Sequence, residues 1–232
     1  MKSKRIKFNW RKYFFETLSM FIAVISAFAL NNWNQERRDY KAEKEIIKAV
    51  KLAVKNDLQT IKTNKAGYKL SKKSCAHLRD LIDNKPINQD SIHEYYTHVF
   101  ANFIFLPNKT GYEGLASKGL DIIKDDLLRA RITYYYNYYF DLLVKFEEQS
   151  DPEAIYLEIN TILAKYMEFD EAGKLSGVTQ PIDITEAQRK KIYSYLWQIE
   201  ANRDQKILVY QYLEEQITTL QSQAESILET MD

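Results

Sequence analysis

The chain contains a single cysteine, Cys75, among its 232 residues. This excludes an internal disulfide framework and any metal site that needs several cysteines from one chain. Glycine and proline are also scarce, at six and four residues, whereas Leu, Ile, Lys, Glu and Tyr are plentiful. No segment alternates apolar and polar residues for long. The composition and the patterning therefore predict an all-α fold of long helices, and strands are not expected.

Recognisable catalytic motifs are missing as well. His93-Glu94 followed by His98 resembles a zinc-protease motif, but histidines five residues apart point about 140° apart on a helix. The glycines from Gly114 to Gly119 lack the order of a phosphate-binding loop. We therefore expect that the protein is not an enzyme and has no catalytic residue, metal ligand or cofactor.

Positive charge is concentrated in the first third of the chain. Residues 1–74 contain 18 of the 33 Lys and Arg residues but only 6 of the 32 Asp and Glu residues, which gives this part a net charge of +12. The remaining residues carry a net charge of −11. This asymmetry indicates either an anionic partner or attraction between the two parts of the chain.

One hydrophobic segment, residues 13–34, has the character of a membrane span. No charged residue lies between Leu18 and Leu30, and about eighteen helical residues reach about 27 Å, close to the hydrocarbon thickness of a bilayer. Trp10 and Trp33 lie near its two ends, where aromatic rings favour the membrane interface. A basic leader, residues 1–12, precedes it. We expect a retained transmembrane helix in contact with membrane lipid; the alternatives are a cleaved signal peptide, a buried helix and a surface helix.

The expected span carries small and polar residues along one side, called here the polar stripe. At 100° per residue, Phe14, Phe21 and Ile25 lie on the opposite side. Small residues let membrane helices approach closely, and an ionisable residue in a membrane normally faces protein or water. We therefore expect a homo-oligomer, formed either around a pore or by packing alone. The candidate pore-lining residues are Glu16, Ser19, Ala23, Ser26 and Asn31.

The flanking charges leave the orientation of this span open. The leader has six Lys and Arg residues, and the other flank has seven through Lys55. The positive-inside rule favours neither side clearly.

After the span, lysines recur at intervals of three and four residues and predict a cationic ridge on one helix face. The ridge consists of Lys41, Lys44, Lys48, Lys51, Lys55, Lys62, Lys65, Lys69 and Lys72. Three interpretations apply: a solvated face, neutralisation by acidic helices of the same chain, or binding of a polyanion. For the third, the candidate ligand-binding residues are Lys44, Lys48, Lys51, Lys55, Lys62 and Lys65.

The rest of the chain, residues 35–232, is predicted to be a soluble helical domain. Helix starts are expected at Ser91-Ile92, Asp151-Pro152 and Thr185-Glu186. The predicted architecture is one N-terminal transmembrane helix that continues into a bundle of long helices. Two amphipathic seams are expected, one formed by Leu128, Ile132, Tyr135, Tyr139, Leu142 and Phe146, and the other by Ile192, Leu196, Ile199, Tyr210, Leu213, Ile217, Leu220, Ala224 and Ile227.

Two stretches of the chain resemble a widespread and largely uncharacterised family of bacterial single-pass membrane proteins. The first is the exit of the span, Leu-Asn-Asn-Trp-Asn-Gln-Glu-Arg-Arg, and the second is a Tyr-x-x-Leu-x-Ser-x-Gly motif followed by an apolar pair and a Leu-Arg helix rich in tyrosine. The span itself is shorter and more polar than the family pattern. The second motif corresponds here to Tyr112, Leu115, Ser117, Gly119, Ile122, Ile123, Leu128, Arg129 and Tyr134.

The layout also resembles the membrane channel effector of Hailong-type antiphage systems. That resemblance implies a ligand-gated ion channel in the bacterial inner membrane, with the helical domain in the cytoplasm. It also implies a short single-stranded DNA oligomer or nucleotide as ligand and a nucleotidyltransferase as partner. The rival hypothesis is a membrane-tethered scaffold that recruits a protein partner and forms no pore.

Overall fold

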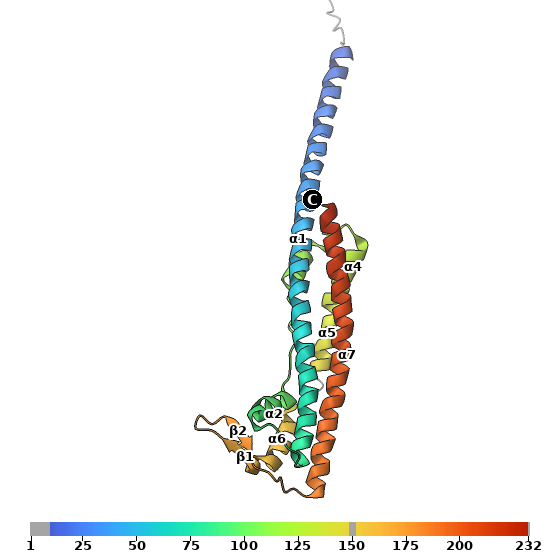
Figure 1. Cartoon of the computed structure of the whole chain (residues 1–232). Helices are drawn as coiled ribbons and strands as arrows, with labels where there is room; N and C mark the ends of the chain where they lie inside the picture. The colour runs from blue at the N-terminus through green and yellow to red at the C-terminus, as the bar shows by residue number, and fades with distance from the viewer. Residues whose placement is uncertain (1–9, 149–151, 232) are drawn as a thin grey trace, which may run out of the picture.

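Two long helices dominate the computed structural model, which describes residues 10–148 and 152–231. Helix α1 (Trp10–Ile82) runs the length of the molecule, and α7 (Glu186–Thr230) returns antiparallel beside it (Figure 1). At about 1.5 Å per residue, the 73 residues of α1 reach about 110 Å and the 45 residues of α7 about 68 Å. The N-terminal part of α1 therefore projects beyond the end of α7.

Shorter elements fill the space along and beyond this pair. They are α2 (Ile92–Phe100), α3 (Thr110–Lys118), α4 (Asp126–Tyr134), a π-helical turn (Tyr135–Tyr139), α5 (Phe140–Glu148) and α6 (Pro152–Leu163). Three short 3-10 turns connect them, at Gln89–Ser91, Leu120–Ile122 and Ala164–Tyr166. The predicted all-α fold, with an apolar N-terminal helix that continues into a helical bundle, is confirmed.

One element was not expected from the sequence, a small antiparallel hairpin at the end of the molecule far from the N-terminus. Strand β1 (Met167–Phe169) pairs with β2 (Leu175–Val178). Asp170 closes the turn because its Oδ1 accepts hydrogen bonds from the amides of Ala172 and Lys174, at 3.0 and 2.8 Å. The hairpin projects sideways beside α2 and α6 (Figure 1). Strands this short contain too few residues for an alternating pattern to stand out.

Helix α1 is continuous through Gly67, although glycine is a poor helix former. The ring of Phe103 lies against this glycine, and a Cβ atom placed there would come within 2.4 Å of Phe103 Cζ. Gly67 therefore serves close packing here. One face of α1 packs into the bundle, and its residues Ile47, Val50, Val54 and Ile61 are all fully buried.

The core is divided into two clusters along the rod. The first joins the middle of α1 to α4, the π-turn and the C-terminal half of α7, with Ile61, Leu128 and Ile217 among its members. The second joins the end of α1 to α2, α6 and the N-terminal half of α7, with Leu78 and Leu196 among its members. Both clusters use α1 and α7, so these two helices hold the bundle together.

Three helix starts follow the sequence signals to different degrees. Thr185 and Gln188 form the complete capping box of α7. Helix α2 begins at Ile92 as expected, but the Ser91 side chain makes no capping hydrogen bond. Helix α6 begins at Pro152, while Asp151 lies outside the described residues.

The seam predicted from Leu128 to Phe146 is shifted by one residue in its second half. Leu128, Ile132, Tyr135 and Tyr139 are buried, but Leu142 is 40% exposed and its neighbour Leu143 is buried at 1%. The π-helical turn at Tyr135–Tyr139 accounts for this, because a π-turn adds one residue to the helix and rotates everything that follows.

Candidate functional site

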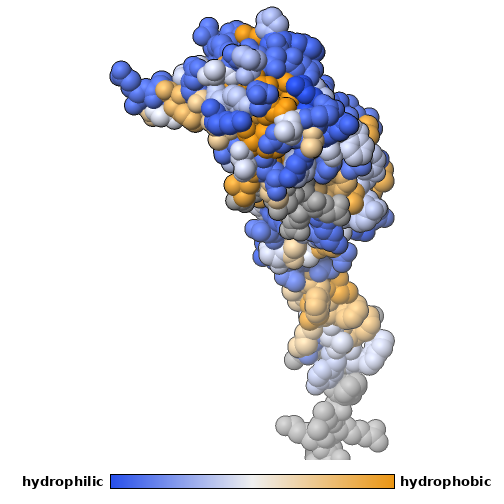
Figure 2. Space-filling model, turned by 90° about the horizontal axis from the view of Figure 1, so that it is seen from below, coloured by the Kyte–Doolittle hydropathy of each residue, from blue (hydrophilic) through white to orange (hydrophobic). Residues whose placement is uncertain are grey.

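The apolar stretch of α1 stands alone outside the bundle. Every described side chain from Tyr13 to Arg38 is exposed, including Phe21 at 63% and Phe28 at 66%. Figure 2 shows an apolar band on the part of α1 that leaves the hydrophilic body. By length and composition this part of α1 can cross a membrane once, which is compatible with the predicted single span. Residues 1–9 of the basic leader lie outside the described residues.

The polar stripe occupies one side of this stretch, because the helix is regular throughout. All five of its members are exposed. The Ser19 hydroxyl donates to the carbonyl of Glu16 at 2.8 Å, and the Thr17 hydroxyl donates to that of Tyr13 at 2.9 Å. Of the stripe members, Ser19 therefore satisfies its hydroxyl donor within the helix and can meet an apolar or a polar neighbour. The stripe consists of Glu16, Ser19, Ala23, Ser26 and Asn31.

The end of α7 is fastened to α1 directly after this stretch. The Tyr40 hydroxyl and the Lys44 ammonium group both donate to the carbonyl oxygen of Met231, each at 2.8 Å. A cation at the C-terminus of a helix stabilises the helix dipole and a carbonyl that lacks a partner within the helix. Lys44, a predicted ligand-binding residue, therefore also holds α7 against α1.

Further along, the cationic face of α1 meets acidic residues of α7. Lys51 pairs with Glu225 at 3.1 Å, and Lys65 pairs with Glu214 in a contact whose side chains are 19% and 25% exposed. The remaining contacts of this ladder are Lys72 with Asp204 and Arg79 with Glu200. Part of the lysine ridge is thus neutralised within the chain, which was one of the three interpretations of the sequence.

Four lysines at the upper end of the ridge line an open groove. It has a volume of about 630 Å³, and Glu225, Leu228 and Glu229 of α7 form its other wall. Lys48 pairs only weakly with its own helix, through Glu45 at 3.1 Å with both side chains more than half exposed. The hydrogen bond from Lys51 lowers the pKa of Glu225, and Gln221 and the charge of Lys55 act in the same direction. This lysine groove is formed on the α1 side by Lys44, Lys48, Lys51 and Lys55.

The other two predicted ligand-binding residues lie outside the groove. Lys65 faces Glu214, and Lys62 is exposed further down α1. Within residues 10–148 and 152–231, Lys62 forms no ion pair. The structure therefore brings four of the six predicted lysines together.

A buried polar contact lies below the groove, and sequence reasoning did not identify it. Asp57 of α1 is 2% exposed and accepts hydrogen bonds from the Asn108 amide at 2.9 Å and the Tyr135 hydroxyl at 3.0 Å. Burial raises the pKa of Asp57 to about 6, although both hydrogen bonds oppose the shift. The contact links α1 directly to the π-turn. One signal for it was Asp57 itself, which is the only acidic residue between Glu45 and Asp80 in the sequence.

Two cations, Arg203 and Lys206, are buried in the α7 seam. Arg203 is 2% exposed and donates to the carbonyl of Ala101 at 2.8 Å and to Ser71 Oγ at 3.3 Å. Lys206 is fully buried and donates to Asn102 Oδ1 at 3.3 Å. Both charges lie over the ring of Tyr68. Carbonyl, hydroxyl and aromatic groups thus solvate these cations where the two core clusters meet.

The Tyr-x-x-Leu-x-Ser-x-Gly stretch attaches α3 to α1. Leu115 is fully buried, and Gly111 lies so close to α1 that a Cβ atom would meet the Val50 backbone nitrogen at 2.8 Å. Gly119 ends the helix with a φ of 95°, a conformation that favours glycine. This motif therefore has a structural role in the contact with α1.

Comparison with known families gives one match. Residues 16–174, more than half of the chain, match the model described as "Family of unknown function (DUF6090)". The matched region begins within the apolar stretch, includes the lysines of the groove and ends in the hairpin. No curated protein and no solved structure matches the chain.

Proposed function

The chain belongs to the DUF6090 family, whose function is unknown, and we propose that it is an oligomeric single-pass membrane protein that acts as a ligand-gated ion channel. In this proposal the polar stripe faces a shared axis, and an anionic ligand binds the lysine groove. The observation that carries the proposal is an apolar helical stretch, exposed on all sides, whose small and polar residues lie along one side.

The polar stripe favours association over simple anchoring. A lone anchor gains nothing from a carboxylate and serines at membrane depth, and an intramembrane ionisable group is stabilised by a protein or water neighbour. The small side chains of Ala23 and Ser26 allow close approach of a second helix. In an assembly of several copies around one axis, Glu16 and Ser19 would line a water-filled pore.

Most of the groove lies beyond the reach of lipid phosphates, and only Lys44, about 15 Å along the axis from Asn34, comes near the headgroup layer. Lys51 follows Asn34 by 17 residues, which places it about 25 Å along the axis, and a tilt of about 40° leaves about 20 Å. The headgroup layer extends only about 5–8 Å beyond the hydrocarbon. A dissolved anion is therefore the favoured ligand, and a nucleotide or a short DNA oligomer fits several ammonium groups in a row.

Because α1 is one continuous helix, a change at the lysine groove can be transmitted along it to the span. An anion bound by Lys51 would compete with Glu225, and α7 would then lose one of the contacts that hold its C-terminal end beside Tyr40 and Lys44. If the ligand binds the closed oligomer better than the open one, it shifts the population toward closure. The resemblance to antiphage effectors supports a defence role in the bacterial inner membrane, with a nucleotidyltransferase as the source of the ligand.

Ion flux from proteoliposomes that contain the purified full chain tests this proposal. We expect flux from the parent protein and loss of flux from Glu16→Leu, with Ile25→Leu on the opposite side of the helix as the matched control. A short DNA oligomer should reduce flux from the parent and have no effect on Lys48→Glu/Lys51→Glu/Lys55→Glu. Absence of flux at every protein density would contradict the channel.

A scaffold that forms no pore is the second candidate, favoured by apolar side chains on the surface of α7. Trp197 is 66% exposed and Leu208 is 65% exposed, and both suit a protein partner. A scaffold would keep its cellular function when residues 13–34 are replaced by an unrelated poly-leucine span. A channel would lose its function.

A further inference from the structure

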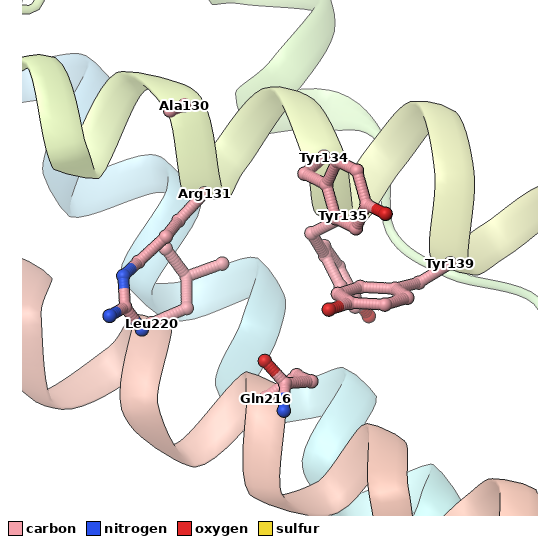
Figure 3. A pocket seen from close by; sticks show the side chains of 7 residues that line it. All are labelled: Ala130, Arg131, Tyr134, Tyr135, Tyr139, Gln216 and Leu220. Carbon is pink, nitrogen blue, oxygen red and sulfur yellow. The ribbon is translucent and has the colours of Figure 1, made fainter.

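A second pocket lies on the other side of α7 from the lysine groove. It has a volume of about 340 Å³, is open to solvent on one side and is lined by residues of α4, the π-turn and α7. Figure 3 shows Arg131 reaching from α4 toward α7 at one end, the tyrosine rings at the other, and Gln216 between them on α7. The lining consists of Ala130, Arg131, Tyr134, Tyr135, Tyr139, Gln216 and Leu220.

The Arg131 side chain supplies an unused donor to this pocket. Its Nε is buried and has no hydrogen-bond partner among the residues that the structure describes. Arg131 also forms no ion pair within those residues. A buried donor without an acceptor costs free energy, and a guanidinium group is shaped to bind a carboxylate or a phosphate. The empty position beside Arg131 therefore suits an acidic group.

The opposite end of the pocket suits a flat ring. Tyr134 and Tyr139 meet edge to face, with their ring centroids 5.0 Å apart, and the Tyr139 hydroxyl lies 2.9 Å from that of Tyr212, which holds its ring in place. Tyr134 is 50% exposed and stacks on Tyr138 with the ring centroids 4.7 Å apart, so the part of its ring that Tyr138 and Tyr139 leave uncovered is available at the mouth of the pocket. Gln216 offers both a donor and an acceptor at the edge of a ring placed there.

We propose that this pocket binds a planar aromatic acid: a ring that stacks against the tyrosines and carries a carboxylate or phosphate for Arg131. The volume lies near the lower end of the range of about 300–1,000 Å³ for small-molecule sites, so one ring system with one acidic group fills it. A π-helical turn at the site agrees with the frequent occurrence of such turns at functional positions.

This site is separate from the lysine groove and reaches α1 by a different contact. Gln216 and Leu220 lie about 180° around α7 from Glu225 and Glu229, which line the groove. Tyr135, whose ring lines the pocket, donates its hydroxyl to Asp57 of α1. A ligand that shifts the Tyr135 side chain would therefore alter its hydrogen bond to Asp57, and so the contact with the helix that continues into the apolar stretch.

Calorimetric titration of the detergent-solubilised full chain tests the proposal with probes that separate its parts. Deoxyadenosine 5′-monophosphate and indole-3-acetate each join a ring to an acidic group, and comparison of the two distinguishes a phosphate source from a carboxylate source. Deoxyadenosine and indole supply the rings alone, and inorganic phosphate and acetate supply the acids alone. We expect at least one of the two joined probes to bind about tenfold or more tightly than either separate part.

Three variants locate the bound probe. Arg131→Gln and Tyr134→Leu should each weaken binding of that probe at one site about tenfold, while Lys48→Gln removes a cation from the lysine groove and should leave binding at that site unchanged. Binding that survives both pocket variants, or no binding of either joined probe, would overturn the proposal. Binding that fails only in Lys48→Gln would place the probe in the lysine groove, which overturns this site and leaves the proposed channel ligand intact.

Discussion

Helix α1 has two halves that place apolar residues in opposite environments. From Tyr13 to Asn34 the apolar side chains cover most of the surface and are exposed, whereas from Glu43 to Ile82 they form one buried seam. A helix that is apolar nearly all round needs an apolar surrounding, and a helix with one apolar stripe needs only a neighbour along that stripe. The helix geometry is the same in both halves, so the difference is compatible with a membrane around the first half and water around the second.

The largest expected effect is a difference in stability between the same substitution, isoleucine to alanine, made in each half of α1. Ile61→Ala removes a fully buried side chain and should lower the free energy of unfolding by about 2–4 kcal/mol. Ile25→Ala, at a position that is 51% exposed, should leave unfolding of the bundle unchanged. Thermal unfolding of the full chain in detergent measures both. Equal losses would show that the two halves do not differ in this way.

A second test addresses the contact of α3 with the buried half of α1. Gly111→Ala places a methyl group against the Val50 backbone and should cost about 1–3 kcal/mol. Gly114→Ala, in the same helix, meets nothing within 4 Å and should stabilise the protein by about 0.5–1 kcal/mol. Chemical denaturation gives both values. A neutral Gly111→Ala would mean that α3 packs less closely on α1 than the structure indicates.

The buried half of α1 also contains a buried carboxyl group, that of Asp57, whereas the side chains of the exposed half are all exposed to their surroundings. The pKa of Asp57 is raised from 3.8 to about 6 in the folded protein, so the folded state binds more protons than the unfolded state between these values. Stability contributed by this group is therefore lost as the pH rises from about 4 to about 6. Asp57→Asn should raise the unfolding free energy by about 1–2 kcal/mol at about pH 7.5, and by little at about pH 4.

Unfolding measured across this pH range tests the role of Asp57. Glu45→Gln, at an exposed position on the same helix, is the matched control and should not change the profile. If Asp57→Asn raises the unfolding free energy equally at both ends of the pH range, the raised pKa of Asp57 is contradicted.

The smallest expected effect concerns the ion pairs that join α1 to α7. Lys65→Glu should cost about 1 kcal/mol, because Lys65 and Glu214 are only partly exposed, and the swap Lys65→Glu/Glu214→Lys should restore most of the loss. A double-mutant cycle measures the coupling. If the swapped pair is as unstable as the single variant, the ladder of ion pairs does not hold these helices together.

The sequence predicts the parts of this structure that repeat with a regular period. The seam of α7 from Ile192 to Ala224 and the capping box at Thr185 were both expected and are present. Regular spacing reports a helix face directly, because each turn repeats the same geometry. The apolar stretch of α1 was equally plain, since it depends on composition alone.

Features that depend on contacts between distant residues could not be predicted in the same way. The π-turn moves the buried position from Leu142 to Leu143, and nothing local in the chain marks the extra residue. The division of the lysines between the groove and the ion pairs depends on where the acidic residues of α7 fall beside them. The pocket around Arg131 likewise needs α4 and α7 to be placed side by side.

Cross-linking within membranes tests most directly whether sister copies meet along the small and polar side of the span. Cys75→Ala first removes the only native cysteine. Single cysteines are then introduced as Ala23→Cys, within the polar stripe, and Ile25→Cys, on the opposite side of the helix. Oxidation should yield covalent dimers from the first variant and not from the second. Equal cross-linking at both positions, or none at Ala23→Cys, would contradict the account.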